Sequence, residues 1–237
     1  FNAGTVVNLF DDSWSQNIAL PFTFCFYGTA YNNIIIGSNG LVSFNVAQAG
    51  GYCQWPINNA VPSNMNPMNT IMGPWHDLNP SLGGSVRYTT YGTAPCRRFV
   101  VSWNAVPMYS CGTPVTQQIV LYETTNIIDN FIQTKPICSW NSGRAIQAVH
   151  NQNGTQAVVQ AGRNSPLQWT INAPEGRRWT PSGANTYTIG WFVGPTQVGN
   201  TAAINVCPTD TTPYTFQATY TNCNNQTVTV SDQAIVN

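Results

Sequence analysis

The hydrophobic positions of this chain fall into short runs that turn residues separate. The runs are rich in β-branched and aromatic residues, strong helix formers are sparse, and 19 glycines and 16 prolines recur every few positions. Short runs bounded in this way are typical of a β-sandwich or β-barrel. We therefore expect strands at residues 22–27, 34–36, 41–44, 85–91, 99–103, 117–122, 127–132, 145–150 and 157–159.

The runs at residues 99–103, 117–122 and 127–132 predict an antiparallel meander. In a meander, the loop after the first strand and the exit from the third strand lie at the same end of the sheet. Cys111 lies in that loop and Cys138 follows that exit. A Cys111–Cys138 disulfide is therefore a geometrically natural hypothesis.

The seven cysteines of the chain favour an oxidising compartment, because they include no C-x-x-C pair and no histidine accompanies them. A zinc site needs clustered cysteines and histidines, which this spacing does not provide. Cys207 and Cys223 flank the run at residues 214–220, and we expect them to pair locally. A Cys25–Cys53 bridge is a further hypothesis. One of the seven thiols is free, pairs outside this chain or is separated from its partner.

The pattern changes near residues 181–187, where proline, serine, glycine and asparagine gather before a Thr-rich alternation of polar and apolar residues. This stretch is typical of a boundary between domains. We expect an all-β chain with a large, jelly-roll-like antiparallel β-sandwich at residues 1–183 and a small Ig-like β-sandwich module at residues 184–237. Strands of the second domain are expected at residues 187–193, 201–206, 214–220 and 227–230.

The charge of the chain excludes several classes of partner. Charged residues make up 7% of the chain, against about a quarter in an average soluble protein. Eight basic residues balance eight acidic ones, and no basic stripe exists that could bind nucleic acid or recruit the chain to a membrane surface. Apolar runs fall short of the roughly 20 residues that a membrane-spanning helix needs, so we expect no membrane insertion. Because the chain begins at Phe1 without a signal segment, we interpret it as a mature or excised fragment.

The loop at residues 76–80 (HDLNP) holds the best polar constellation for a metal ion. Asp77 and Asn79 could supply hard oxygen ligands to Ca²⁺, which takes six to eight of them. The alternative is that Asp77 caps a turn or accepts backbone hydrogen bonds, as aspartates in turns do. Apart from this hypothetical Ca²⁺, we expect no cofactor.

Catalytic patterns are weak, and we expect no enzyme. No G-x-S-x-G elbow lies near His76 or His150. A glycosidase needs two carboxyl groups facing one another, and the spacing of Glu123, Glu175 and the Asp11-Asp12 pair does not argue for it.

Aromatic residues at turns suggest a sugar-binding patch. Rings beside Asn and Gln side chains match the apolar faces and hydroxyl groups of sugars. The alternative is that the rings fill the core of the sandwich, and an exposed cluster would distinguish the two. The residues concerned are Tyr52, Trp55, Trp75, Tyr109, Trp140, Trp169 and Trp179.

Several segments resemble a known family of surface proteins. They lie at residues 20–28 (LPFTFCFYG), 36–44 (IGSNGLVSF), 71–77 (IMGPWHD), 94–102 (APCRRFVVS) and 117–132, and the tail segments at 206–214, 220–223 and 228–232 join them. The N-terminal segments are similar to ectodomains of gliding-motility-associated, adhesin-like proteins that Bacteroidetes export by the type 9 secretion system. The GPW-x-D core with the strand after it also resembles the nidogen-type extracellular domain, and the tail resembles the Ig-like modules that follow such ectodomains.

The resemblance implies a non-enzymatic adhesin or binding module that is extracellular or displayed on the cell surface. Its expected partners are an extracellular glycan or surface, or neighbouring protein subunits, and not nucleic acid. The alternative is a structural stalk or filament subunit of a surface appendage. A polysaccharide hydrolase is the third hypothesis.

Overall fold

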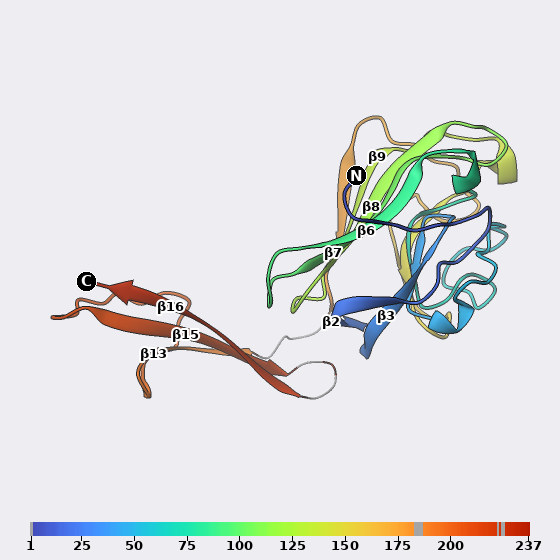
Figure 1. Cartoon of the computed structure of the whole chain (residues 1–237). Helices are drawn as coiled ribbons and strands as arrows, with labels where there is room; N and C mark the ends of the chain where they lie inside the picture. Colours follow the sequence, from blue (N-terminus) through green and yellow to red (C-terminus); the bar gives the residue numbers. More distant parts are fainter. Residues whose placement is uncertain (1, 183–186, 222, 224–225) are drawn as a thin grey trace. The chain divides into compact units, whose positions relative to one another are not determined.

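The computed structural model describes residues 2–182, 187–221, 223 and 226–237, and the chain forms two compact units (Figure 1). The first unit comprises Phe1–Tyr27 and Tyr31–Pro181, and the second comprises Gly28–Ala30 and Ser182–Asn237. The boundary expected between residues 183 and 184 lies outside the described residues. The described residues are all β apart from short 3₁₀ turns, and none of them forms a helix long and apolar enough to cross a membrane.

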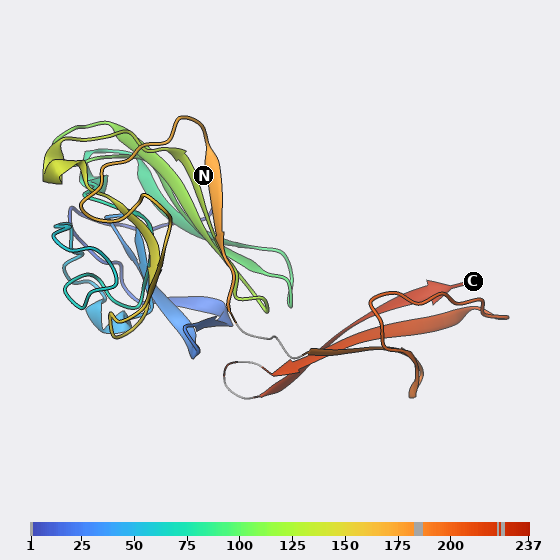
Figure 2. The same cartoon turned by 180° about the vertical axis from the view of Figure 1, so that it is seen from behind.

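The first unit contains two antiparallel sheets of six strands each (Figures 1 and 2). The first sheet has the order β1 (Thr5–Val6), β6 (Ser85–Tyr91), β7 (Arg98–Pro107), β8 (Pro114–Tyr122), β9 (Ile128–Thr134) and β12 (Glu175–Trp179). The second has the order β11 (Ala157–Val159), β10 (Ile146–His150), β5 (Thr70–Trp75), β4 (Leu41–Ser43), β3 (Thr29–Gly37) and β2 (Ile18–Phe26). Three 3₁₀ turns lie in the connections, at η1 (Val46–Gln48), η2 (Pro80–Leu82) and η3 (Trp140–Gly143).

The main hydrophobic core lies between the two sheets. Along β2, Phe22, Phe24 and Phe26 are buried while their neighbours are more exposed, which is the two-residue period of a strand with one buried face. These rings join buried residues of the first sheet such as Phe99 and Trp103 in one contiguous cluster. The expected large antiparallel sandwich is therefore present.

The central strands of the second sheet are buried on both faces. Ile34 and Ile36 of β3 belong to the main core, whereas Ile35 between them belongs to a second core on the outer face. Strands that are buried on both faces lose the alternation and become continuous apolar runs, which explains the Ile-Ile-Ile sequence. The outer residues Ile35, Leu41, Met72, Trp75, Ile146 and Ala148 are covered by Trp14, Cys53, Ile57 and Val61 from two long connections.

The predicted meander is confirmed, because β7 pairs with β8 and β8 pairs with β9 in antiparallel register. Three strands of the first unit, β1, β5 and β12, were not among those predicted. β5 contains Gly-Pro, and proline disfavours a strand because it has no N–H to donate to the ladder. The register against β10 shifts at this point, so no ladder hydrogen bond is required from Pro74. The segment around Glu175 forms the edge strand β12, which pairs with β9.

One of the three predicted disulfides, Cys111–Cys138, is present. Cys111 and Cys138 are bonded, with their Cα atoms 5.9 Å apart. Cys25 and Cys223 are also disulfide-bonded, whereas Cys53, Cys96 and Cys207 are free. The expected Cys25–Cys53 and Cys207–Cys223 bridges are therefore wrong.

Strand length explains both errors, because the Cα atoms of a disulfide lie within about 7 Å of each other. Cys25 lies beside the hairpin turn between β2 and β3, while Cys53 lies against Gly37 at the far end of β3. The nine residues of β3 separate these places by about 25 Å. Likewise, β15 (Thr212–Thr221) lies between Cys207 and Cys223, and a strand of that length spans about 30 Å.

The second unit is a single antiparallel sheet of four strands among the described residues. Its order is β14 (Thr196–Gly199), β13 (Tyr187–Val193), β15 and β16 (Thr227–Val236). The expected two-layer Ig-like module is therefore not what these residues form, and residues 201–206 contain no strand. The apolar alternation packs within one sheet instead, where the Trp191 ring lies 5.0 Å from the Phe216 ring and its indole donates to the Thr201 carbonyl.

We predict that replacing both Cys111 and Cys138 by serine lowers the free energy of unfolding by about 3–4 kcal/mol. The bridge closes a loop with a sequence separation of 27 residues, and removing it restores the loop-closure entropy of the unfolded chain. Urea denaturation measures the change. Cys96→Ser, which removes an exposed free thiol, is the control and should leave the midpoint unchanged. Equal midpoints for the double variant and the control would contradict this account.

Candidate functional site

The site begins with two turns that hydrogen bonds join side by side. The Ser13 hydroxyl closes the first turn by accepting from the Phe10 N–H and donating to the Phe10 carbonyl, at 2.8 and 2.9 Å. The Ser38 N–H donates to the Ser13 carbonyl, and the Ser13 N–H donates to the Ser38 hydroxyl. The N-terminal turn is thereby fixed against the β3–β4 turn.

The buried amide of Asn39 joins these turns to two further segments. Its Nδ2 donates to Asp12 Oδ1 at 2.9 Å and to the Cys53 carbonyl at 3.0 Å. Its Oδ1 accepts from the Leu78 N–H at 2.8 Å. Because Leu78 follows Asp77, the same side chain positions Asp12 and the backbone beside Asp77.

Three carboxyl groups meet at this place. Asp11, Asp12 and Asp77 each offer an oxygen, and these atoms all lie within 4.8 Å of one another. Within the part of the chain that the structure describes, this is the only group of three or more His, Cys, Asp or Glu side chains close enough to share a metal ion. Asn79 has another role, since its Oδ1 accepts from the Ser81 N–H at 2.9 Å and caps η2.

The surroundings of the three carboxyl groups oppose their ionisation. Burial raises the pKa of Asp77 to about 7, while the Trp140 hydrogen bond opposes the rise and the charges of Asp12 and Asp11 add to it. Burial also raises the pKa values of Asp11 and Asp12. The hydrogen bond from Asn39 lowers the pKa of Asp12, but does not cancel this effect. The fold thus gathers negative groups without a neutralising partner.

Two oxygens of this group have no hydrogen-bond partner among the described residues. Asp77 Oδ2 accepts from the Trp140 indole N–H at 2.7 Å, but the buried Asp77 Oδ1 accepts from nothing. Asp11 Oδ1 is also buried and unpaired. Asp77 is only 6% exposed. A buried acceptor without a donor is costly, about 1–3 kcal/mol for a neutral group and more for a charged one, so these atoms call for an additional ligand.

An aromatic cluster lies directly beside the carboxyl groups. The Trp140 ring lies 5.5 Å from the Trp55 ring and 5.0 Å from the Tyr109 ring. Trp140 is 37% exposed, and Trp55 and Tyr109 are half-buried. The Cys111–Cys138 bridge joins the loop that carries Tyr109 to the segment before η3, which carries Trp140. Three of the seven aromatic residues expected to be of interest therefore form a partly exposed group, which we call the aromatic trio.

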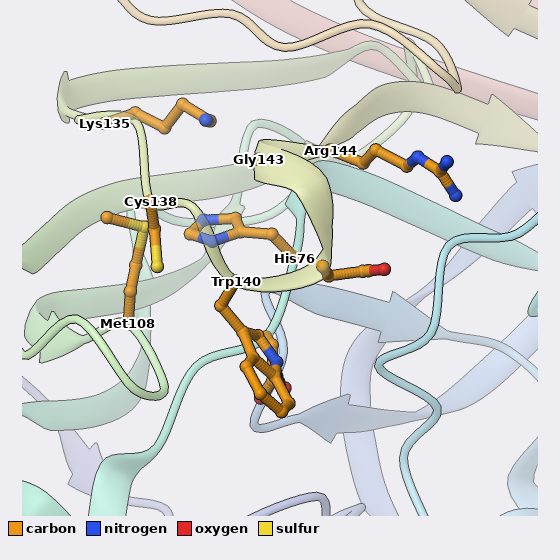
Figure 3. Close-up of a pocket in the computed structure, with 9 residues that line it drawn as sticks. His76, Met108, Lys135, Cys138, Trp140, Gly143 and Arg144 are labelled. Carbon is orange, nitrogen blue, oxygen red and sulfur yellow. Dashed lines mark hydrogen bonds between the residues drawn. The ribbon is translucent and has the colours of Figure 1, made fainter.

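A small hollow of about 10 Å³ lies next to Asp77 (Figure 3). Its volume is enough for about one water molecule. His76 lines it with a buried Nε2 that has no partner among the described residues. Burial, with a contribution from the nearby Lys135 charge, holds the pKa of His76 well below its usual value. The side chain of Arg144 points away from the His76 ring and donates to the Ile57 carbonyl.

Lys135, the only lysine of the chain, is buried beside this hollow. Its Nζ donates to the Trp169 carbonyl at 2.7 Å and lies 4.7 Å from the centre of the Trp169 ring. Burial, and to a smaller extent the charge of Arg163, lowers the pKa of Lys135 to about 8. No carboxylate balances it in the ion pairs of the described residues.

Most of the remaining candidate residues have structural roles. His150 is buried, with its Nδ1 2.8 Å from the Pro67 carbonyl and its Nε2 accepting from the Ser63 N–H. Glu123 pairs with Arg97, and Glu175 pairs with Arg163 and Arg177. Of the other aromatic residues, Trp75 and Trp169 are buried in the cores, Trp179 packs against the main core, and Tyr52 is 60% exposed.

The sequence analysis named Asp77 but not its partners. Asp11 and Asp12 stood out only as an adjacent pair near the start of the chain. Their meeting with Asp77 depends on tertiary hydrogen bonds through Asn39, which no sequence pattern shows.

One comparison with known proteins identifies a family. A family model described as "NIDO related" matches residues 1–218. No curated protein and no solved structure matches the chain.

We predict that Asn39→Leu lowers the free energy of unfolding by about 2–4 kcal/mol. Leucine has a similar shape but leaves Asp12 Oδ1, the Cys53 carbonyl and the Leu78 N–H without their partner. Urea denaturation followed by tryptophan fluorescence measures the loss. Asn32→Leu is the control, because Asn32 is exposed and, among the described residues, its side chain bonds only to the Thr23 hydroxyl. Similar midpoints for both variants would show that the Asn39 amide does not hold the turns together.

We predict that the stability conferred by Lys135 rises with pH between about 8 and 10.5, the folded pKa and the ordinary lysine value. In this window the unfolded chain binds a proton that the folded chain does not, so raising the pH favours folding. Between these pH values, the free energy of unfolding of the wild-type chain should rise relative to that of Lys135→Met by at most about 1.4 kcal/mol per pH unit. Tyrosines that titrate in the same range are common to both proteins. Urea denaturation of both at several pH values tests this, and a difference that does not change with pH would refute it.

Proposed function

Because the chain belongs to the NIDO-related family, we propose that it is an extracellular binding module that works as a surface adhesin. The family is nidogen-like, and membership suggests an extracellular binding role. The disulfides add support, because such bonds persist in oxidising compartments. The finer part of the proposal rests on the residues around the carboxyl groups.

We assign glycan binding to the aromatic trio. The observation that carries this assignment is the partly exposed Trp140 ring, flanked by Trp55 and Tyr109 and hydrogen-bonded to Asp77. Aromatic rings pack against the apolar faces of sugars, while nearby oxygens and amides bond to their hydroxyl groups. Exposed Tyr52 extends the same region, because its backbone pairs with Ser13 beside the carboxyl groups.

The composition of the chain suits contact with neutral ligands. Charged residues make up only 7% of the chain, and polarity comes mainly from asparagine, threonine, glutamine and serine. Neutral hydrogen bonds contribute about 0.5–1.5 kcal/mol each, so a single site of this kind binds weakly. Display of many copies on a surface would supply the avidity of an adhesin.

Binding without catalysis agrees best with the geometry near Asp77. A glycosidase needs a cleft in which two carboxyl groups flank a sugar ring. The hollow beside Asp77 has a volume of about 10 Å³, and Glu123 and Glu175 are held in ion pairs. We therefore rank a polysaccharide hydrolase last among the candidates.

The biological setting is a further part of the proposal. The segments that resemble gliding-associated ectodomains support assignment to a large surface protein exported by the type 9 secretion system of Bacteroidetes. In that setting the chain would contact extracellular glycans or solid surfaces.

A structural stalk or filament subunit is the second candidate, and the second unit supports it. β16 is a ten-residue strand at the edge of its sheet, and it carries one charged residue, Asp232. Long edge strands with little charge pair readily with a neighbouring chain.

We predict that the chain, displayed multivalently, binds a defined class of sugars on a glycan array, and that Trp55→Ala weakens this binding at least fivefold. Trp55 contributes a ring to the aromatic trio, and truncated aromatic anchors typically cost more than about 1 kcal/mol of binding energy. Tyr91→Ala is the matched control, because Tyr91 is 45% exposed on β6 and lies outside the aromatic trio.

Binding that is unaffected by Trp55→Ala would move the glycan site elsewhere. Silence of the multivalent wild-type chain on the array would refute glycan binding. In that case, concentration-dependent assembly of the chain in sedimentation velocity experiments would favour the filament subunit.

A further inference from the structure

We propose that Asp11, Asp12 and Asp77 form a Ca²⁺-binding site. This inference goes beyond glycan binding, because it concerns the ion alone and holds whether or not the aromatic trio binds sugars. The site differs from the Asp77 and Asn79 pair expected from the sequence, since Asn79 caps η2 and the partners of Asp77 come from the N-terminal turn.

The geometry of the three carboxyl groups favours a shared cation. The ligand oxygens of the three side chains lie within 4.8 Å of one another, and two oxygens that share a calcium ion at about 2.4 Å from each lie at most about 4.8 Å apart. Three carboxyl groups from two distant segments therefore already converge closely enough to touch one ion.

The hydrogen bonds around Asp77 point to a ligand independently of the clustering. Trp140 occupies Asp77 Oδ2, so Asp77 has Oδ1 to offer, and this atom is buried without a partner among the described residues. Asp77 itself is only 6% exposed, so this oxygen is shielded from bulk solvent. Asp11 Oδ1 is likewise buried and has no hydrogen-bond partner among the described residues. A cation bound between these two oxygens would take the place of the hydrogen-bond donors that they lack.

The balance of charge around the three carboxyl groups also favours a cation. Every ion pair of the described residues uses Glu123, Glu175 or Asp129, and none reaches Asp11, Asp12 or Asp77. Three carboxylates without a basic neighbour repel one another, and a divalent ion offsets that repulsion.

The ligand chemistry selects Ca²⁺ among the common ions. All three side chains offer hard oxygens, and the group contains no histidine or cysteine, which zinc prefers. Ca²⁺ accepts irregular arrangements of six to eight oxygens, whereas Mg²⁺ demands a near-ideal octahedron. Water and loop carbonyls would complete the shell. Extracellular modules with such partial shells bind Ca²⁺ with dissociation constants on the order of 10⁻⁴–10⁻³ M.

Two of the ligands are already held in position. Asn39 donates to Asp12 Oδ1, and Trp140 donates to Asp77 Oδ2, so each carboxylate keeps its orientation before an ion arrives. Asp12 also has a left-handed backbone, with φ of 51°, a conformation that aspartate tolerates better than most residues. Ion binding therefore requires little ordering of the loops, which favours affinity.

Isothermal titration of the chelator-treated, dialysed chain with CaCl₂ tests the proposal without any sugar. We expect one Ca²⁺ per chain, a higher melting temperature in CaCl₂ than in NaCl of equal ionic strength, and weaker binding of MgCl₂. Asp12→Asn and Asp77→Asn should each weaken Ca²⁺ binding at least tenfold. Both changes keep an oxygen that can accept the bond from Asn39 or Trp140. Asp232→Asn on β16, outside the cluster, is the matched control and should bind as the wild type does.

Terbium provides a second readout, which reports whether the bound ion lies close to a tryptophan. Tb³⁺ binds oxygen sites of similar size and emits when a nearby tryptophan transfers excitation energy to it, and Trp140 is bonded to Asp77. We expect tryptophan-sensitised emission from wild-type chain, its displacement by Ca²⁺, and its loss in Asp12→Asn. Absence of Ca²⁺ and Tb³⁺ binding by the folded wild-type chain at millimolar concentration would overturn the proposal. Equal binding by the wild-type chain and both cluster variants, with folding verified by near-UV circular dichroism, would overturn it too.

Discussion

The arrangement of the candidate site depends on one buried amide. Asn39 donates to Asp12 and to the Cys53 carbonyl, and accepts from the Leu78 N–H. It therefore joins the N-terminal turn, the β3–β4 turn, the connection between β4 and β5, and the segment after β5. All of its polar atoms are used inside the protein, where an unmade hydrogen bond would cost about 1–3 kcal/mol. A buried polar network that is fully satisfied specifies one arrangement, because any other arrangement leaves some group unpaired. The positions of Asp12 and Asp77 therefore follow from the same constraint that closes this end of the sandwich.

The hydrophobic core and the polar site depend on the same connections. The central strands of the second sheet are buried on both faces, and their outer face is covered by Trp14, Cys53, Ile57 and Val61. The segments that bring these apolar side chains also carry Asp12, Tyr52 and Trp55. Burial of the apolar residues thus holds the loops against the sheet, and their polar and aromatic residues come to lie together at one end of it. The cost of ordering these long connections is offset by the apolar area they cover, which is the dominant favourable term in folding.

The sequence predicted the features that depend on local alternation, and missed those that depend on tertiary contacts. The meander and the Cys111–Cys138 bridge follow from strand order and antiparallel geometry, and both are present. β5 was missed because its Gly-Pro reads locally as a turn, and only the irregular pairing with β10 makes proline acceptable there. The Cys207–Cys223 bridge was wrong because proximity along the chain is not proximity in space across an extended strand. Asp77 was named, but Asp12 lies 65 residues before it, and only the Asn39 contacts bring the two together. Trp55, Tyr109 and Trp140 were among seven aromatic candidates, and local sequence could not tell which of them remain exposed.

The proposed ion site and the aromatic trio share one hydrogen bond, which has a thermodynamic consequence. The Trp140 indole that donates to Asp77 is also the central ring of the trio. An ion bound at Asp77 would hold that carboxylate in its charged form, and a charged acceptor makes a stronger hydrogen bond to the indole than a neutral one does. The ion would therefore favour the ring orientation that faces a sugar. If the sugar in turn requires this orientation, sugar binding must raise the affinity for the ion by the same factor as the ion raises the affinity for the sugar. Extracellular calcium would then regulate adhesion through a single indole N–H, with no movement of the sheets.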